Sequence, residues 1–194
     1  VVRDVTFAVA PGRTVAIVGQ SGSGKSTIAQ AISGLLPPNG KIVAGDATLT
    51  GTNVVGLRER SWRALRGQVL AYVPQDPVGS LDPLEKVGAL VARSLVLHRG
   101  LGRREARGEA VALLDRVGIR DARGKANSYP HELSGGQLQR ALIAAAIAGN
   151  PKVLIADEPT SALDVTVQAV ILDLIDELQA ELRLGVLLIT HDLG

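Results

Sequence analysis

The chain has 194 residues, 46% of them apolar, which is enough to bury the core of a globular domain and excludes a disordered segment. Its 21 basic and 19 acidic residues nearly balance, so charge gives no reason to expect a nucleic-acid partner. The lack of cysteine excludes a disulfide framework within these residues, and no apolar run approaches the roughly 20 residues that span a bilayer. The sequence shows no secretory signal, and we expect a cytoplasmic protein.

The first 18 residues predict two strands. Residues 5–9 alternate between apolar and polar side chains before a Pro-Gly turn, whereas residues 14–18 form a continuous apolar run typical of a buried strand. Phe7 is the only aromatic residue before position 19, and its place in the strand pattern predicts a core position. Because the chain lacks methionine and begins inside an apolar alternation, we expect it to be a segment of a longer protein.

A glycine-rich loop follows the second strand and precedes helical spacing over residues 28–36. The loop reads Gly19, Gln20, Ser21, Gly22, Ser23, Gly24, Lys25, Ser26 and Thr27. Strand, glycine-rich turn and helix together are the context of a phosphate-binding loop, in which backbone N–H groups and the helix N-terminus point at an anion. Lys25 would bring its charge to the β- and γ-phosphates of a nucleotide, and the Ser26 hydroxyl would ligate Mg²⁺.

The next segment continues with strand and helix signals. Residues 41–50 predict a further strand in an antiparallel hairpin arrangement. Helical spacing over residues 57–65 surrounds Trp62, which we expect to be a packing residue. Residues 68–73 predict a strand that stops at a proline, and Gln75 lies in the turn that follows.

Two helices are predicted next, over residues 84–97 and 105–117, with a glycine-containing break between them. They interrupt the alternation of strands and helices, so we take residues 84–150 as an inserted helical subdomain. Five arginines crowd this stretch, either as a solvated helical face or as a docking surface for a partner. They are Arg93, Arg99, Arg103, Arg104 and Arg107.

A second anion-binding helix N-terminus is predicted in the same chain. Ser134 is a typical N-cap residue, and Gly135, Gly136 and Gln137 open a long Ala/Leu/Ile-rich helix behind it. The loop at 19–27 already accounts for the phosphates of one nucleotide. The alternative is that the two glycines only allow tight packing.

Two more buried strands are predicted over residues 153–156 and 186–190, with a helix between them that Asp164 caps. Continuous apolar strands alternating with helices predict an α/β fold with a mostly parallel sheet covered on both faces, beside the antiparallel part near the N-terminus. Such sheets bind ligands at the carboxyl ends of their strands, and His191 follows the last of these strands.

Four residues at strand ends fit the hydrolysis of a phosphoanhydride, which needs charge neutralisation and an aligned water. Asp157 is placed to hold Mg²⁺ through its water shell, and Glu158 points elsewhere and is free to polarise the attacking water. Gln75 would sense Mg²⁺ or the water, and His191 would contact the γ-phosphate. An isolated Asp-Glu pair or a single histidine is more often structural. Because a phosphate-binding loop is present in the same chain, we instead assign these residues to a catalytic site.

These patterns resemble the nucleotide-binding domain of ABC transporters, and six motifs in the family's order cover nearly the whole chain. They are Walker A (residues 19–27), the Q-loop (Gln75), the signature motif (133–137), Walker B with its catalytic glutamate (153–158), the D-loop (Ser161, Ala162, Leu163 and Asp164) and the H-loop (His191). The resemblance implies a P-loop NTPase core of the ABC ATPase fold that binds ATP and Mg²⁺ and hydrolyses ATP.

The resemblance also implies partners. Two such domains would pair head to tail, as a homodimer or a heterodimer, and Ser134, Gly135 and Gly136 of one would contact the γ-phosphate held by the other. The resemblance also implies that Gln137 of the signature motif and Asp164 of the D-loop contribute to nucleotide binding. Permease subunits would insert a coupling helix near the Q-loop and the helical subdomain, and a solute-binding protein would take part indirectly. The subunit would then lie at the cytoplasmic face of the cell membrane, and no nucleic acid is expected.

Residues 75–83, 129–132 and 156–168 look like the matching stretches of ATPases that serve oligopeptide, dipeptide and nickel importers. The resemblance therefore implies solute import. Two features of the family are expected to lie outside the residues given. The aromatic residue that stacks on adenine in this family would precede the first residue here, since Phe7, the only aromatic residue before Gly19, fits a core position better. The extension that the peptide-importer branch carries would follow the H-loop.

An alternative is a soluble ABC-family ATPase that acts on the ribosome or DNA. Such proteins usually carry tandem domains or a long coiled-coil insertion, and residues 84–150 lack sustained heptads. A P-loop kinase is disfavoured by the signature motif and the H-loop. We assign residues 1–194 to one ABC ATPase domain, with residues 1–83 and 151–194 as a RecA-like core and 84–150 as the helical subdomain that carries the signature motif.

Overall fold

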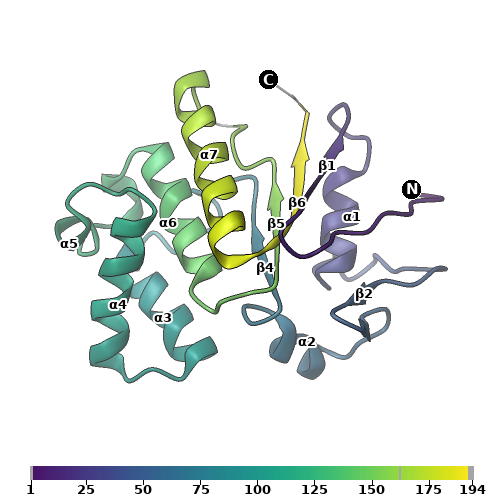
Figure 1. Cartoon of the computed structure of the whole chain (residues 1–194), viewed down its shortest axis with the longest axis horizontal. Coiled ribbons are helices and arrows are strands. Elements are labelled where there is room, and N and C mark those ends of the chain that lie inside the picture. The colour runs from purple at the N-terminus through teal and green to yellow at the C-terminus, as the bar shows by residue number, and fades with distance from the viewer. Residues whose placement is uncertain (1, 162, 192–194) are drawn as a thin grey trace.

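A parallel sheet organises the chain in the computed structural model, which describes residues 2–161 and 163–191 (Figure 1). Its strands lie in the order β1-β6-β5-β4. They are β1 (Thr14–Val18), β4 (Leu70–Val73), β5 (Val153–Asp157) and β6 (Gly185–Thr190). Val18 pairs with Thr190, Ile189 with Asp157, and Ala156 with Val73, so the carboxyl ends of the strands share one edge of the sheet.

Helices lie on both sides of this sheet. They are α1 (Lys25–Ile32), α2 (Glu59–Leu65), α3 (Val87–Arg99), α4 (Arg103–Arg116), α5 (Ala122–Lys125), α6 (Gly135–Ile147) and α7 (Val165–Leu182), with a 3-10 helix η1 (Pro130–Glu132). Figure 1 shows α3 to α6 gathered on one side, and α1, α2 and the antiparallel pair β2 (Thr48–Leu49) and β3 (Thr52–Asn53) on the other. Within the described residues, no helix is long and apolar enough to cross a membrane.

The central strands are buried on both faces because alternate side chains of a strand point to opposite sides. In β5, Leu154 and Ala156 pack with the cores of α3, α4, α6 and α7. Ile155 faces the other way and packs with Ala29 of α1 and Trp62 of α2. This arrangement explains the continuous apolar runs of β5 and β6 and confirms the predicted α/β fold with its antiparallel part.

Three sequence expectations were wrong in detail. Residues 5–9 form no strand, and Phe7 is 37% exposed instead of buried, because no described strand pairs with this segment. β1 lies at the edge of the described sheet, so Val18 is 43% exposed. Of residues 41–50, only Thr48–Leu49 pairs in a strand, since Gly45 takes a φ of 89° that breaks the extended backbone.

Other predicted elements agree closely with the structure. Trp62 is 5% exposed and packs in the core, as expected. Ser134 and Asp164 cap α6 and α7, each accepting a hydrogen bond from a backbone N–H of the first turn. The predicted helix over 28–36 begins earlier, at Lys25, and ends at Ile32. The division into a core and a helical subdomain stays a prediction.

Candidate functional site

The glycine-rich loop joins the end of β1 to the first residue of α1. Gly22 and Gly24 have φ values of 80° and 94°, which only glycine adopts without strain, and Gly24 is the N-cap of α1. A Cβ on Gly19 would lie 3.1 Å from the Ser23 hydroxyl oxygen, so the loop closes tightly on itself. The first N–H groups of an α-helix have no acceptor within the helix, so the N-terminus of α1 at this loop can bind an anion.

Lys25 is 6% exposed and lies across this loop. Its Nζ donates to the carbonyl oxygens of Gly19 (2.8 Å) and Gln20 (3.0 Å), and lies 3.5 Å from Oε1 of Glu158. Phosphate oxygens are charged acceptors and bind an ammonium more strongly than carbonyls do. The loop and Lys25 therefore fit the phosphates of a nucleotide.

The Asp157 carboxylate lies directly beside Ser26. The Ser26 hydroxyl donates to Oδ1 of Asp157 at 2.9 Å, and the Tyr72 hydroxyl donates to Oδ2 at 2.6 Å. Asp157 is only 2% exposed. A hydroxyl and a carboxylate are the oxygen donors that Mg²⁺ prefers, usually together with substrate phosphates, so this pair fits a magnesium ion at the loop.

Tyr72 is a site residue that the sequence analysis missed. Burial, and then the hydrogen bond and the negative charge of Asp157, raise the pKa of its hydroxyl far above the usual value. The group therefore stays protonated and acts as a donor. Because Tyr72 lies in the apolar run of β4, the sequence predicts only a packing role for it. No sequence pattern indicates its contact with Asp157.

Glu158 lies at the centre of the cluster and is 9% exposed. Its Oε2 accepts a hydrogen bond from Nε2 of Gln75 at 2.9 Å and lies 3.3 Å from Nδ1 of His191, while Oε1 faces Lys25. The backbone of Glu158 has a φ of 45°, a costly conformation for a side chain that is not glycine, and such strain is concentrated at functional sites. The structure thus brings together residues that the sequence separates by more than a hundred positions.

The remaining loop residues frame this cluster. The backbone N–H of Ser23 donates to the Gln20 carbonyl at 3.2 Å and closes the turn. Ser21 and Ser23 are exposed, and Thr27 is half-buried in the first turn of α1.

The signature residues 134–137 do not join this cluster within one chain, since α6 and α1 lie on opposite sides of the sheet (Figure 1). Ser134 and Gln137 cap each other: the Ser134 Oγ accepts from the Gln137 N–H, and the Gln137 Oε1 accepts from the Ser134 N–H. A Cβ on Gly136 would lie 2.6 Å from Cγ1 of Val167, and one on Gly135 would lie 3.2 Å from Cδ2 of Leu163. The glycines therefore do allow tight packing, and their contact with a nucleotide stays a prediction.

The D-loop connects this packing to Glu158. The Ser161 hydroxyl donates to the Glu158 carbonyl at 3.1 Å, and Asp164 accepts from the Val167 N–H at 3.0 Å as the cap of α7. Ala162 lies outside the described residues. The Asp164 carboxylate is engaged as the cap of α7, so its predicted role towards a nucleotide also depends on a second domain.

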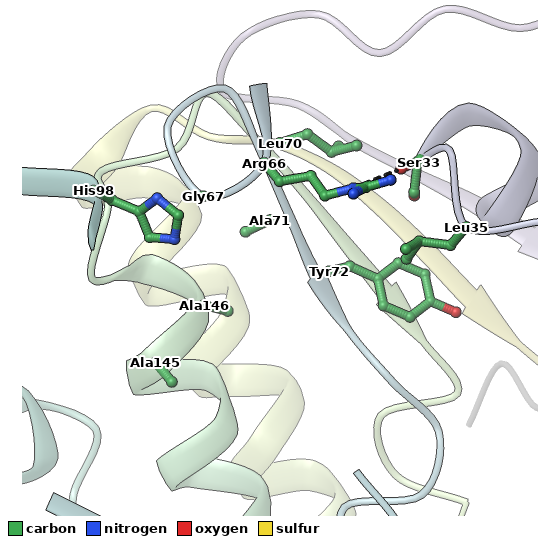
Figure 2. A pocket seen from close by; sticks show the side chains of 10 residues that line it. All are labelled: Ser33, Leu35, Arg66, Gly67, Leu70, Ala71, Tyr72, His98, Ala145 and Ala146. Atoms are coloured by element: carbon green, nitrogen blue, oxygen red, sulfur yellow. Dashed lines mark hydrogen bonds between the residues drawn. The ribbon is translucent and has the colours of Figure 1, made fainter. Parts of the chain in front are cut away.

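A cavity of about 170 Å³ lies along β4, between this strand, the end of α1, α3 and α6, and Tyr72 is the site residue that lines it (Figure 2). Arg66 crosses it and donates to the carbonyl of Ser33 at 3.3 Å. Burial lowers the pKa of His98 in its wall. The lining residues are Ser33, Leu35, Arg66, Gly67, Leu70, Ala71, Tyr72, His98, Ala145 and Ala146.

Comparison with known proteins identifies this arrangement. A family model described as ABC transporter matches residues 2–161. The chain belongs to the ABC transporter family. Among curated ABC relatives, it is 51% identical to a putative peptide import ATP-binding protein of Brucella melitensis and 48% identical to the oligopeptide transport ATP-binding protein OppD of Salmonella typhimurium. It is 44% identical to the dipeptide transport ATP-binding protein DppD of Lactococcus lactis.

Each of these matches covers 100% of this chain but only 59%, 57% and 56% of the respective relative, so the chain spans less than two thirds of their length. Among solved structures, a dimeric ATP-binding cassette in a post-hydrolysis state, bound to ADP and Pi, superposes with a TM-score of 0.85 at 32% identity. That match covers 98% of this chain and 79% of the cassette. The predicted ABC ATPase fold is confirmed.

Proposed function

We propose that this chain binds and hydrolyses Mg-ATP as the ATP-binding subunit of an ABC importer, and that the solutes are peptides or related compounds such as nickel. One observation carries the proposal: the functional side chains that follow four different strands converge around Glu158. They are Lys25, Ser26, Gln75, Asp157, Glu158 and His191. The names of the relatives support peptides as the solutes, and they do not favour the alternative of an ATPase acting on ribosomes or DNA.

The loop and Lys25 would hold the phosphates, and Ser26 and Asp157 would hold Mg²⁺. The metal, when bound, neutralises charge that develops on the transferred phosphoryl group. The phosphates would draw the Lys25 ammonium away from the Gly19 and Gln20 carbonyls and from Glu158, because a charged acceptor competes well against neutral ones.

Glu158 would then act as the general base. Once Lys25 turns to the phosphates, Gln75 and His191 still contact Oε2 of Glu158 and hold the carboxylate in place. A base fixed from two sides can align and deprotonate a water without first reorganising. Gln75 would also contact Mg²⁺ or the water, and His191 would contact the γ-phosphate.

The complete site would need a second cassette. Residues 134–137 and Asp164 of the partner would close on the nucleotide, because the exposed N-terminus of α6 has N–H groups with no acceptor inside the helix. A permease segment would contact the surface near the Q-loop residue Gln75 and the helical subdomain. The subunit would thereby lie at the cytoplasmic face of the membrane, with a solute-binding protein acting indirectly and no nucleic acid involved.

Phosphate release by the full-length protein, assembled with its permease in vesicles, tests this function. We expect Mg-ATP to be hydrolysed and EDTA to stop the reaction. Uptake of a labelled dipeptide and of Ni²⁺ into the same vesicles identifies the solute class. Hydrolysis without uptake of either solute would contradict the importer assignment and leave the ATPase assignment in place.

A further inference from the structure

Both oxygens of the Asp157 carboxylate are held by hydroxyl groups from distant segments. Ser26 belongs to the phosphate loop and reaches Oδ1, whereas Tyr72 belongs to β4 and reaches Oδ2. With 2% exposure, the carboxylate has little access to bulk water that could replace either donor. The orientation of its plane is therefore set by these two contacts.

The ring of Tyr72 is itself fixed in place. It packs with the apolar cluster of Trp62 and Ile155, and it lines the cavity described above. Figure 2 shows the ring beside Leu35, with its hydroxyl directed away from His98. Packing of the ring positions its hydroxyl 2.6 Å from Oδ2 of Asp157.

Towards the Asp157 carboxylate, the Tyr72 hydroxyl can act only as a hydrogen-bond donor. A phenol hydroxyl has one proton to donate, and at 2.6 Å from Oδ2 it gives that hydrogen bond to Asp157. The oxygen lone pairs of Asp157 that neither hydroxyl occupies stay available to the water molecules of a metal ion.

We propose that Tyr72 is a positioning residue of the magnesium site, which orients Asp157 by holding Oδ2 while Ser26 holds Oδ1. The inference rests on the proposed Mg-ATP function and adds to it a residue that no motif of the family supplied. Partners that orient metal-holding groups affect metal affinity strongly, and their loss typically weakens it by roughly 10- to 100-fold.

The test uses the full-length protein with Glu158→Gln, so that binding is measured without turnover. A fluorescent ATP analogue is titrated first in EDTA and then at rising Mg²⁺ concentration. In the Tyr72→Phe variant, which loses one oxygen atom, we expect the half-saturating Mg²⁺ concentration to rise about tenfold or more, while nucleotide affinity in EDTA is unchanged. Tyr72→Met, which keeps an apolar side chain without the hydroxyl, is expected to show the same rise.

Tyr129→Phe is the matched control, because it makes the same chemical change in an exposed ring that stacks on His131. We expect no change in its Mg²⁺ dependence. An unchanged half-saturating Mg²⁺ concentration in Tyr72→Phe and Tyr72→Met would overturn the inference, and so would an equal loss of affinity with and without Mg²⁺. If the Glu158→Gln parent itself shows no Mg²⁺-dependent binding, the proposed function fails and the inference falls with it.

Discussion

Glu158 receives contacts from three side chains that follow three different strands: Lys25 after β1, Gln75 after β4 and His191 after β6. Asp157, its neighbour in sequence, has a separate set of partners in Ser26 and Tyr72. Two adjacent carboxylates thereby serve two separate groups of side chains. The left-handed backbone of Glu158 accompanies this divergence, since it lies immediately after the extended residue Asp157.

Replacing Glu158 by Gln should remove turnover and keep nucleotide binding. The amide retains the size of the side chain and can still contact Gln75, but it cannot accept a proton from water. We expect the hydrolysis rate to fall by roughly 10²- to 10⁴-fold, measured as phosphate release. Glu177→Gln on the exposed face of α7 is the control and should hydrolyse normally. An unchanged rate in Glu158→Gln would contradict the role of Glu158 as base.

Replacing Lys25 by Ala should weaken nucleotide binding itself. The variant loses a charged donor to the phosphates, which corresponds to roughly 10- to 100-fold in affinity. Titration with a fluorescent nucleotide measures the loss. Lys152→Ala is a matched control, because Lys152 is exposed and precedes β5, at the opposite end from Asp157. Equal affinities of Lys25→Ala and the unaltered protein would show that the loop binds phosphate without this side chain.

At the scale of elements, α6 and α7 meet where two glycines open one helix and Val167 lies in the first turn of the other. A Cβ on Gly136 would lie 2.6 Å from Cγ1 of Val167, so the two helices can pack at this distance only because position 136 is glycine. The capping pair Ser134 and Gln137 fixes the start of α6 at this contact. Signature motif and D-loop are therefore one packed unit within the chain.

Gly136→Ala tests this packing. Alanine favours a helix by about 1 kcal/mol over glycine, but overpacking against Val167 costs about 1–3 kcal/mol, so we expect a net loss of stability. In a Val167→Ala background the same change should become stabilising, because the clash is gone. Denaturant unfolding of the four proteins measures both signs. A destabilisation of equal size in both backgrounds would show that Val167 is not the obstacle.

His98 makes the link between α3 and the segment before β4 sensitive to pH. A Cβ on Gly67 would lie 2.3 Å from its ring, and Gln68 donates to its carbonyl at 2.9 Å. Burial lowers the pKa of His98 below its usual value of 6.5, so the folded state binds fewer protons than the unfolded state. The stabilisation is fully present above pH 6.5 and is lost as the pH falls from there towards the lowered pKa.

We expect the free energy of unfolding to fall between about pH 7.5 and about pH 5.5, and to fall less in His98→Gln. Denaturant unfolding at both pH values measures the difference, with His131→Gln on η1 as the control variant. The same pH dependence in His98→Gln and in the unaltered protein would assign the effect to other groups.

The sequence was most informative where backbone chemistry is local. Neighbouring residues alone determine turn conformation, helix capping and hydrophobic period. For this reason the sequence predicted the phosphate loop, the caps Ser134 and Asp164, and the buried strands β5 and β6. The segments at 5–9 and 41–50 were mispredicted because a short alternating stretch forms a strand only where a partner strand lies beside it. Tyr72 and Val167 could not be predicted, since their contacts join segments that no sequence period relates.

On the scale of the whole molecule, the sheet separates two apolar clusters and carries the candidate site at one edge. The cluster around α1 and Trp62 supports the phosphate loop, and the cluster of α3, α4, α6 and α7 supports the signature residues. The two helix N-termini that we expect to bind phosphate therefore lie on opposite sides of one sheet. Within one chain these two helix N-termini do not face the same space, which supports the proposed head-to-tail dimer.

Light scattering of the full-length protein with Glu158→Gln tests that dimer. We expect the mass to double when ATP is added, because the signature residues of one copy complete the site of another. Adding Ser134→Asp should prevent the doubling: aspartate still caps a helix, but its charge repels the γ-phosphate. A monomer that binds ATP would mean that the natural partner is a different ATPase.

Trp62 gives the chain an optical reporter of its own. It is the only tryptophan, it is 5% exposed, and its ring packs against Gly34 just beyond the end of α1. Arg66 lies over the ring, 5.3 Å from its centre, and also binds the Gly34 carbonyl at 2.7 Å. Because α1 begins at Lys25, any shift of this helix when phosphates are bound changes the surroundings of the indole. The emission of Trp62 should therefore follow nucleotide binding without an attached dye.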